Sequence, residues 1–187
     1  GINQAYDYGD FYTHLGKLIK GYERLVISHG SDLVFEHEFE ENFKSIRSRP
    51  SIVQEASSLL KSYRLIKSDH EINALQKAID VTHQSLEEVL PLIPGLSFEY
   101  EVQAAIEYGF ARRGAERMGF PSIVGAGKNA TYLHYEDNHG TLLAGDLLLM
   151  DIGAEWNYYS ADISRTVPIS GKFSSEQSAI YQLVLDA

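Results

Sequence analysis

Two aspartates, Asp151 and Asp162, are the residues whose type and spacing suggest chemistry. Asp151 interrupts the apolar run Leu147–Ile152, which reads as a strand, and Asp162 lies in a second strand-like run, Tyr158–Thr166. A hairpin turning at Trp156-Asn157 would place the two carboxylates directly opposite each other on one face. Like charges at that distance repel, and we expect at least the Asp151 carboxylate to be buried, which is costly for an unpaired charge.

Three states could resolve this conflict. The carboxylates could share a proton, pair with a cation such as Arg165, or hold a metal ion. Strand alternation places Arg165 on the opposite face from Asp162, which weakens the ion-pair alternative. Metal binding uses both charges, whereas a solvated or turn-capping pair is the plain structural alternative. His134, in a run Tyr132–Tyr135 that reads as a half-buried strand, becomes a candidate only through its relation to the two aspartates.

A glycine-rich segment, residues 125–130, matches the dinucleotide-binding pattern G-x-G-x-x-[GA] in its letters alone. That pattern needs a helix directly afterwards, so that the helix N-terminus can hold pyrophosphate. The residues that follow, Thr131–Tyr135, are strand-like instead. A phosphate loop is also excluded, because Asn129 and Ser122 stand where that motif requires Ser or Thr and Gly. We interpret the glycines as turn residues.

The elements around these residues predict an α+β fold. Ser68 and Glu71 form a capping-box pattern that begins a helix at about 69–91, and Ser97 could cap a second helix, 98–113, that stops at Gly114. Four strands are expected next, at 120–124, 132–135, 147–152 and 158–166, with the third covered on both faces. A last helix opens at 174–176 and should turn Ile180, Leu183 and Val184 inward. Residues 1–62 read as the end of an α/β unit, with a helix near 11–19, a strand at 24–28 and an aromatic helix face at Phe35, Phe39 and Phe43.

Composition excludes several other classes of protein. The sequence has 187 residues, 44% hydrophobic and 22% charged, which is ordinary globular composition. Its 16 basic and 26 acidic residues give a net charge of −10 and argue against a nucleic-acid partner. No apolar run approaches the roughly 20 residues of a membrane span, so we expect no membrane partner and a cytoplasmic location. The absence of cysteine excludes a thiolate zinc site and a cysteine nucleophile.

Three blocks of the sequence carry a family pattern: Ile123–Gly127 leading to Leu133–Tyr135, Leu149–Gly153, and Tyr159–Pro168. They resemble aminopeptidase P and prolidase of the pita-bread metallopeptidases. The 17-residue step from His134 to Asp151 and the 11-residue step to Asp162 agree with that family's pattern. Tyr63–Glu71 resembles the entry to its catalytic domain. The resemblance implies the end of an α/β N-terminal domain at 1–62 and the first half of a pita-bread fold at 63–187.

The same resemblance implies a function. By motif position, Asp151 would bind one metal ion, Asp162 would bridge two, and His134 would be a catalytic residue contacting substrate or the tetrahedral intermediate. The ions would be Mn²⁺, with Co²⁺ or Zn²⁺ as alternatives, and oxygen ligands suit Mn²⁺. Metal-activated water would attack the carbonyl before proline. The implied enzyme is an Xaa-Pro aminopeptidase whose partner is a proline-containing peptide, with a homo-oligomer expected at full length.

The resemblance implies that only two of the family's metal ligands occur in the sequence, with its remaining His and two Glu in a second half of the fold that is expected beyond Ala187. We therefore expect a fragment that is inactive alone and an active parent enzyme. The alternatives are a prolidase acting on dipeptides and a peptidase-like binding module without catalysis. Methionine aminopeptidase has a different histidine segment, and the retention of both Asp151 and Asp162 counts against the metal-free creatinase.

Overall fold

The computed structural model describes residues 7–28 and 32–187, which fall into two compact units, Gly1–Lys67 and Ser68–Ala187. The first unit has a parallel strand pair, β1 (Arg24–Ile27) and β2 (Ile52–Glu55), joined through helix α2 (Leu33–Ser45). The short helix η1 (Tyr8–Asp10), α1 (Phe11–Leu18) and α3 (Ala56–Leu65) complete its described elements. The domain boundary at 62/63 stays a prediction.

An aromatic cluster holds the first unit together. Phe35, Phe39 and Phe43 recur every four residues along α2, and neighbouring rings lie 5.6–6.0 Å apart. Their face of the helix packs with Leu15 and Ile19 of the α1 segment, both buried. The predicted aromatic helix face, the first helix and the strand at 24–28 are therefore confirmed.

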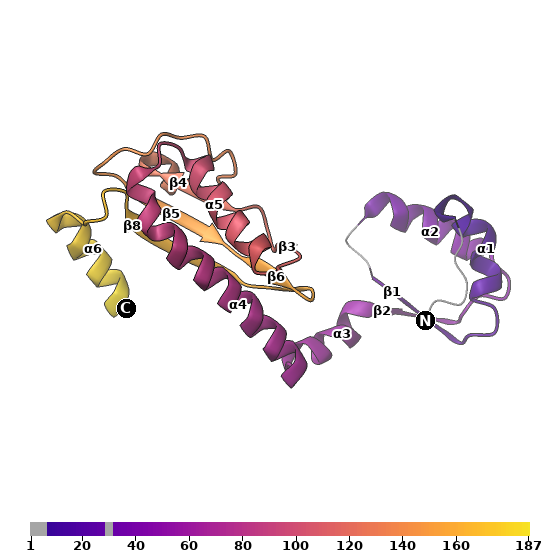
Figure 1. The fold of residues 1–187 in the computed structure, drawn as a ribbon. Coiled ribbons are helices and arrows are strands. Elements are labelled where there is room, and N and C mark those ends of the chain that lie inside the picture. The colour runs from indigo at the N-terminus through magenta and orange to yellow at the C-terminus, as the bar shows by residue number, and fades with distance from the viewer. Residues whose placement is uncertain (1–6, 29–31) are drawn as a thin grey trace. The chain divides into compact units, whose positions relative to one another are not determined.

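The second unit places two long helices against antiparallel strands (Figure 1). Helix α4 (Asp69–Val89) runs into the short helix η2 (Leu90–Gly95) and is followed by α5 (Glu99–Arg112). One three-stranded sheet has the order β4 (Ile123–Ala126), β5 (Leu147–Ile152) and β8 (Ile163–Pro168). A second has the order β3 (Arg117–Met118), β6 (Ala154–Trp156) and β7 (Tyr159–Ser160). The remaining elements are η3 (Gly127–Thr131) and α6 (Ser175–Asp186).

Local signals explain both long helices. Ser68 accepts a hydrogen bond from the Glu71 N–H, and the Glu71 carboxylate accepts from the Ser68 N–H at 2.7 Å, so the predicted capping box is confirmed. The expected cap at Ser97 is wrong: Phe98 is the N-cap residue of α5, and the Glu101 carboxylate accepts from the N–H groups of Ser97 and Phe98. The predicted helix end is confirmed, since Gly114 follows α5 with φ of +84°.

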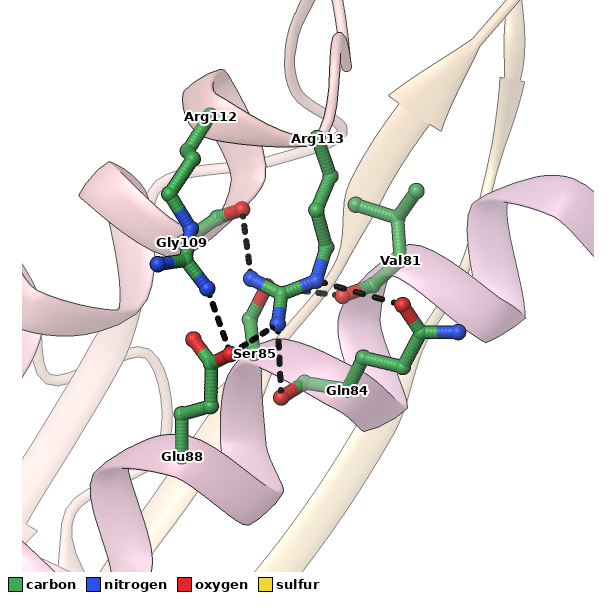
Figure 2. Close-up of polar contacts among 7 residues, drawn as sticks. All are labelled: Val81, Gln84, Ser85, Glu88, Gly109, Arg112 and Arg113. Atoms are coloured by element: carbon green, nitrogen blue, oxygen red, sulfur yellow. Dashed lines mark hydrogen bonds and ion pairs between the residues drawn. The ribbon is translucent and has the colours of Figure 1, made fainter.

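The crossing of α4 and α5 is close and is bridged by the guanidinium groups of Arg112 and Arg113. A Cβ on Gly109 of α5 would lie 2.7 Å from Cβ of Ser85 on α4, so only glycine permits this approach. Arg113 donates to the Gly109 carbonyl at 3.1 Å and to Gln84 of α4, and it shares Glu88 with Arg112 (Figure 2). Together these contacts fix the helix pair that supports the sheet.

The sheet has one buried face. In β5, Leu148, Met150 and Ile152 are fully buried against α4 and α5, whereas the alternating residues are half-buried. The expectation of a strand covered on both faces is therefore wrong. Asp151 lies on the less covered face, because it alternates with the three core residues.

Several predicted boundaries are also wrong. Strand β4 begins at Ile123 rather than Phe120, since Pro121 has no N–H to donate to a ladder. No strand forms at 132–135, and the run 158–166 divides into β7 and β8. On α6, Ile180, Leu183 and Val184 are 63%, 67% and 74% exposed instead of inward, because no described element covers that face. None of the described helices is both long and apolar enough to span a membrane.

Candidate metal site

A two-residue turn sets the register of the strands that carry the aspartates. Asn157 and Tyr158 have φ of +48° and +66°, the left-handed pair that tight hairpin turns use. The turn lies one residue later than the sequence predicts, so every pairing shifts by two. Asp151 faces Ser164, and the expected direct opposition of Asp151 and Asp162 is wrong.

The two aspartates nevertheless share a face and a pocket. Because side chains alternate along a strand, a shift of two residues leaves both on the same side of the sheet. Diagonal neighbours of this kind lie roughly 7–8 Å apart, within reach of a common ligand. A pocket of about 280 Å³ is lined by both carboxylates, together with His134, Glu136 and the apolar residues Phe120, Pro121 and Ile123.

The carboxylates are more open than the sequence suggests. Asp151 is half-buried and Asp162 is exposed, so the expectation of a buried charge is only partly met for Asp151. The Asp151 carboxylate accepts one hydrogen bond, from the Ser164 hydroxyl at 2.9 Å. Arg165 is the cross-strand neighbour of Met150, on the face of the sheet opposite to the two aspartates. Its side chain donates a hydrogen bond to the Ser164 carbonyl. Among the described residues, no Lys or Arg forms an ion pair with either aspartate.

His134 reaches the pocket from a turn, not from a strand. It follows η3, its φ is +52°, and its side chain is exposed. The strand prediction at 132–135 fails for this reason, because a residue with positive φ cannot continue an extended ladder. His134 lines the same pocket as both aspartates, and its assignment as a catalytic residue stays a prediction.

Glu136 is the pocket residue that sequence reasoning missed. It lies two residues beyond His134 in the same loop, and its side chain lines the pocket. The only signal in the sequence was its position two residues after His134. A single glutamate in a loop has no characteristic spacing from other candidate ligands that would mark it as a site residue.

The end of this loop is anchored by an asparagine. Asn138 is 1% exposed, and its side chain accepts from the Val124 N–H at 2.9 Å and donates to the Ser122 carbonyl at 2.8 Å. It also donates to Gln103 of α5 at 2.9 Å. The loop that carries His134 and Glu136 is thereby tied to both β4 and α5.

The donor set fits a hard divalent cation only in part. Two carboxylates on one face, with no cationic partner, supply the oxygen ligands that Mn²⁺ and similar ions accept. However, the described residues contain no group of three or more His, Asp or Glu side chains arranged to hold an ion. Asp151 and Asp162 therefore form one side of a site rather than a complete coordination shell.

Comparison with known proteins settles the family. The model of metallopeptidase family M24 matches residues 73–187, which is more than half of the chain and includes the whole pocket. The chain belongs to metallopeptidase family M24. The resemblance to aminopeptidase P within this family is confirmed by the relatives that follow.

Relatives within the family agree over the full chain. The Xaa-Pro aminopeptidase of Haemophilus influenzae is 38% identical over 100% of this chain, which covers 42% of that protein. The structure of Pseudomonas aeruginosa aminopeptidase PepP is 35% identical with a TM-score of 0.85, and the chain covers 44% of it. A zinc-substituted Escherichia coli aminopeptidase P in complex with product is 29% identical with a TM-score of 0.87.

These matches confirm the predicted fold class, the first half of a pita-bread fold preceded by α/β structure. The chain spans less than half of the length of each of these three relatives.

Proposed function

We propose that this chain contributes the first two aspartate ligands to a metal-dependent peptidase that removes the N-terminal residue from peptides with proline in second position. The observation that carries the proposal is the pocket that unites His134, Asp151 and Asp162 in a member of a metallopeptidase family. The names of its relatives, Xaa-Pro aminopeptidases in two bacteria, supply the substrate class.

Asp151 and Asp162 would hold two divalent ions together with ligands that these residues do not provide. Mn²⁺ is our first choice because both ligands are carboxylates. Zn²⁺ is supported as an alternative by the zinc-substituted relative, and Co²⁺ is a further one. When bound, such ions polarise a scissile carbonyl and make water a stronger nucleophile at neutral pH.

The side chains of the pocket have separable roles in this proposal. The Ser164 hydroxyl binds one oxygen of Asp151 and so orients the other toward a ligand. The exposed ring of His134 is free to donate a hydrogen bond to the substrate carbonyl as negative charge develops on its oxygen. Phe120, Pro121 and Ile123 would form an apolar wall beside the reacting bond.

Manganese binding is the experiment that tests the proposal. Calorimetry would compare this chain with a longer protein that contains this chain together with the second half of the pita-bread fold. Each would be measured beside its Asp151→Asn, Asp162→Asn double variant. We expect tight binding by the longer protein, loss of it in its double variant, and weak binding by this chain. Asp137→Asn is the matched control, because Asp137 is exposed in the same loop but does not line the pocket. If the longer protein binds manganese equally well without the two carboxylates, the site assignment is wrong.

Peptide hydrolysis separates the remaining alternatives. Cleavage of an Xaa-Pro tripeptide by the longer protein supports an aminopeptidase, and cleavage of dipeptides alone supports a prolidase. Metal binding without cleavage of either supports a binding module. We expect no cleavage by the 187-residue chain alone, since it brings only two ligands. A cytoplasmic location and a homo-oligomer at full length stay predictions.

A further inference from the structure

A buried glutamate outside the pocket is not used by the proposed chemistry. Glu99, the first residue of α5, is 0% exposed and forms no ion pair with any described residue. A carboxylate in such a place is costly to bury unless hydrogen bonds replace its lost hydration. The partners that replace it therefore indicate what the residue is for.

All four side-chain partners of Glu99 belong to one segment, residues 126–140. One oxygen accepts from the Ala126 N–H at 2.7 Å and from the Asn129 side chain at 3.0 Å. The other accepts from the Tyr135 hydroxyl at 2.8 Å and from the Gly140 N–H at 2.6 Å. Each partner is a donor, so a single carboxylate ties down both ends and the middle of the segment.

The segment wraps closely around this carboxylate. A Cβ on Gly140 would lie 2.5 Å from Oε1 of Glu99, and the backbone N–H of Glu99 donates to the Gly140 carbonyl at 3.0 Å. The Tyr135 hydroxyl also accepts from the Asn129 side chain at 3.0 Å. These contacts leave the segment little freedom to shift as a unit relative to α5.

His134 is the residue whose position depends most on this arrangement. It directly precedes Tyr135, and its φ of +52° is a left-handed conformation that non-glycine residues rarely adopt. Such a conformation persists only where its surroundings enforce it. The hydrogen bond from the Tyr135 hydroxyl to Glu99 holds the side chain of the next residue, whereas the exposed ring of His134 has no described hydrogen-bond partner of its own.

We propose that Glu99 is a positioning residue that holds His134 in the pocket, facing Asp151 and Asp162. The consequence for catalysis rests on the function proposed above, whereas the positioning itself does not. One of the four partners of the Glu99 side chain, Ala126, is the last residue of β4, and the other three lie in the segment that carries His134. Asn138 still ties the far end of that segment to β4 and α5 when the Glu99 carboxylate is lost. The loss therefore loosens the segment around His134, while α4, α5 and the rest of the sheet remain folded.

The sharpest perturbation is Glu99→Gln, which keeps the shape and changes one oxygen to an amide nitrogen. A backbone N–H points at each of the two oxygens, from Ala126 and from Gly140, and neither can reverse its direction. Whichever way the amide lies, its NH₂ meets a backbone donor. Tyr135→Phe is a milder second variant that removes one donor and keeps the ring.

Glu101→Gln is the matched control. Glu101 lies on the same helix and also accepts from backbone N–H groups, but these belong to Ser97 and Phe98 rather than to the segment that carries His134. The substitution thus repeats the same chemical change without touching the proposed support.

The measurement is nuclear Overhauser spectroscopy on the 187-residue chain, without metal or substrate. We expect cross-peaks between the His134 ring and the pocket side chains Phe120, Pro121 or Ile123 in the parent and in Glu101→Gln. They should be lost in Glu99→Gln and weakened in Tyr135→Phe, while cross-peaks within the core are unchanged.

Retention of the His134 cross-peaks in Glu99→Gln, or their absence in the parent, would overturn the inference. If Glu99→Gln does not fold, Tyr135→Phe decides in the same way. Because neither metal nor activity enters the measurement, its failure is distinct from a failure of the proposed peptidase function, which the manganese experiment tests.

Discussion

Replacing Thr82 by valine should weaken the unit that carries the site by leaving one buried N–H without a partner. Thr82 lies on α4 and is 0% exposed. Its hydroxyl accepts from the Ala154 N–H at 2.9 Å and donates to the Ala78 carbonyl at 2.8 Å. Ala154, also 0% exposed, begins β6 just beyond the strand of Asp151. This contact joins the helix layer to the metal-site hairpin.

The magnitude follows from what valine cannot do. Valine keeps the branched shape of threonine but has no acceptor, so the Ala154 N–H becomes a buried donor without a partner, which costs about 1–3 kcal/mol. The Ala78 carbonyl contributes little, because its helical partner, the N–H of residue 82, remains. We therefore expect the free energy of unfolding to fall by about 1–3 kcal/mol.

The assay uses the only tryptophan of the chain, Trp156, which lies in β6 two residues from Ala154. Its fluorescence during urea unfolding reports on this unit, and the midpoint should fall at an unchanged slope. Thr131→Val is the control, since that exposed hydroxyl donates only to the Lys128 carbonyl. The Ala154 amide should also exchange its hydrogen faster in Thr82→Val. Equal midpoints for the two variants, with a slowly exchanging Ala154 amide, would refute the reasoning.

Three further predictions concern the supports of the site. Arg113→Met should lower the free energy of unfolding, measured in urea, by about 1–3 kcal/mol. The reason is that its side chain is 15% exposed and its guanidinium binds two helix carbonyls (Figure 2). Arg112→Met is the control and should lower the free energy of unfolding clearly less, because that side chain is 46% exposed. Gly153→Ala should cost about 3 kcal/mol or more, or prevent folding, since its Cβ would lie 1.8 Å from the Ala161 carbonyl oxygen, and circular dichroism on heating would show it. Burial, followed by the hydrogen bond to a carboxylate, raises the pKa of Tyr135. Folding therefore favours its protonated form, and the resulting stability is complete below about pH 10 and is lost as pH rises through the raised pKa. Tyr135→Phe should flatten the decline of stability in alkaline urea titrations, and an unchanged decline would contradict this.

The long helices could be predicted because their signals are local. The capping box at Ser68 and Glu71 and the glycine after α5 each act within one helical turn. Burial does not follow apolar character alone: Ile72 and Ile79 of α4 are 52% and 40% exposed, whereas Val102, Ile106 and Phe110 of α5 are buried. The cover of α6 could not be predicted in this way, because apolar spacing shows which face needs a partner and not whether the chain supplies one.

The conformation of His134 could not be predicted for a different reason. Its segment, with Tyr132, Leu133 and Tyr135, has the composition of a strand. The structure instead makes it a turn, because Glu99, more than thirty residues earlier, binds donors throughout the segment. A contact over that distance leaves no trace in local composition, so local propensity gave way to tertiary structure.

The aspartate pair shows which part of a register can be trusted from sequence. Asp162 follows Asp151 by 11 positions, which is an odd step along the chain. In any hairpin with a two-residue turn, two positions with an odd separation lie on the same face, wherever the turn falls. Moving the turn by one residue slid the pairing by two, which changed the partner of Asp151 to Ser164 but not its face. The shared pocket was therefore predictable, whereas the direct opposition depended on the turn. An even separation would have placed the carboxylates on opposite faces and excluded a common metal site.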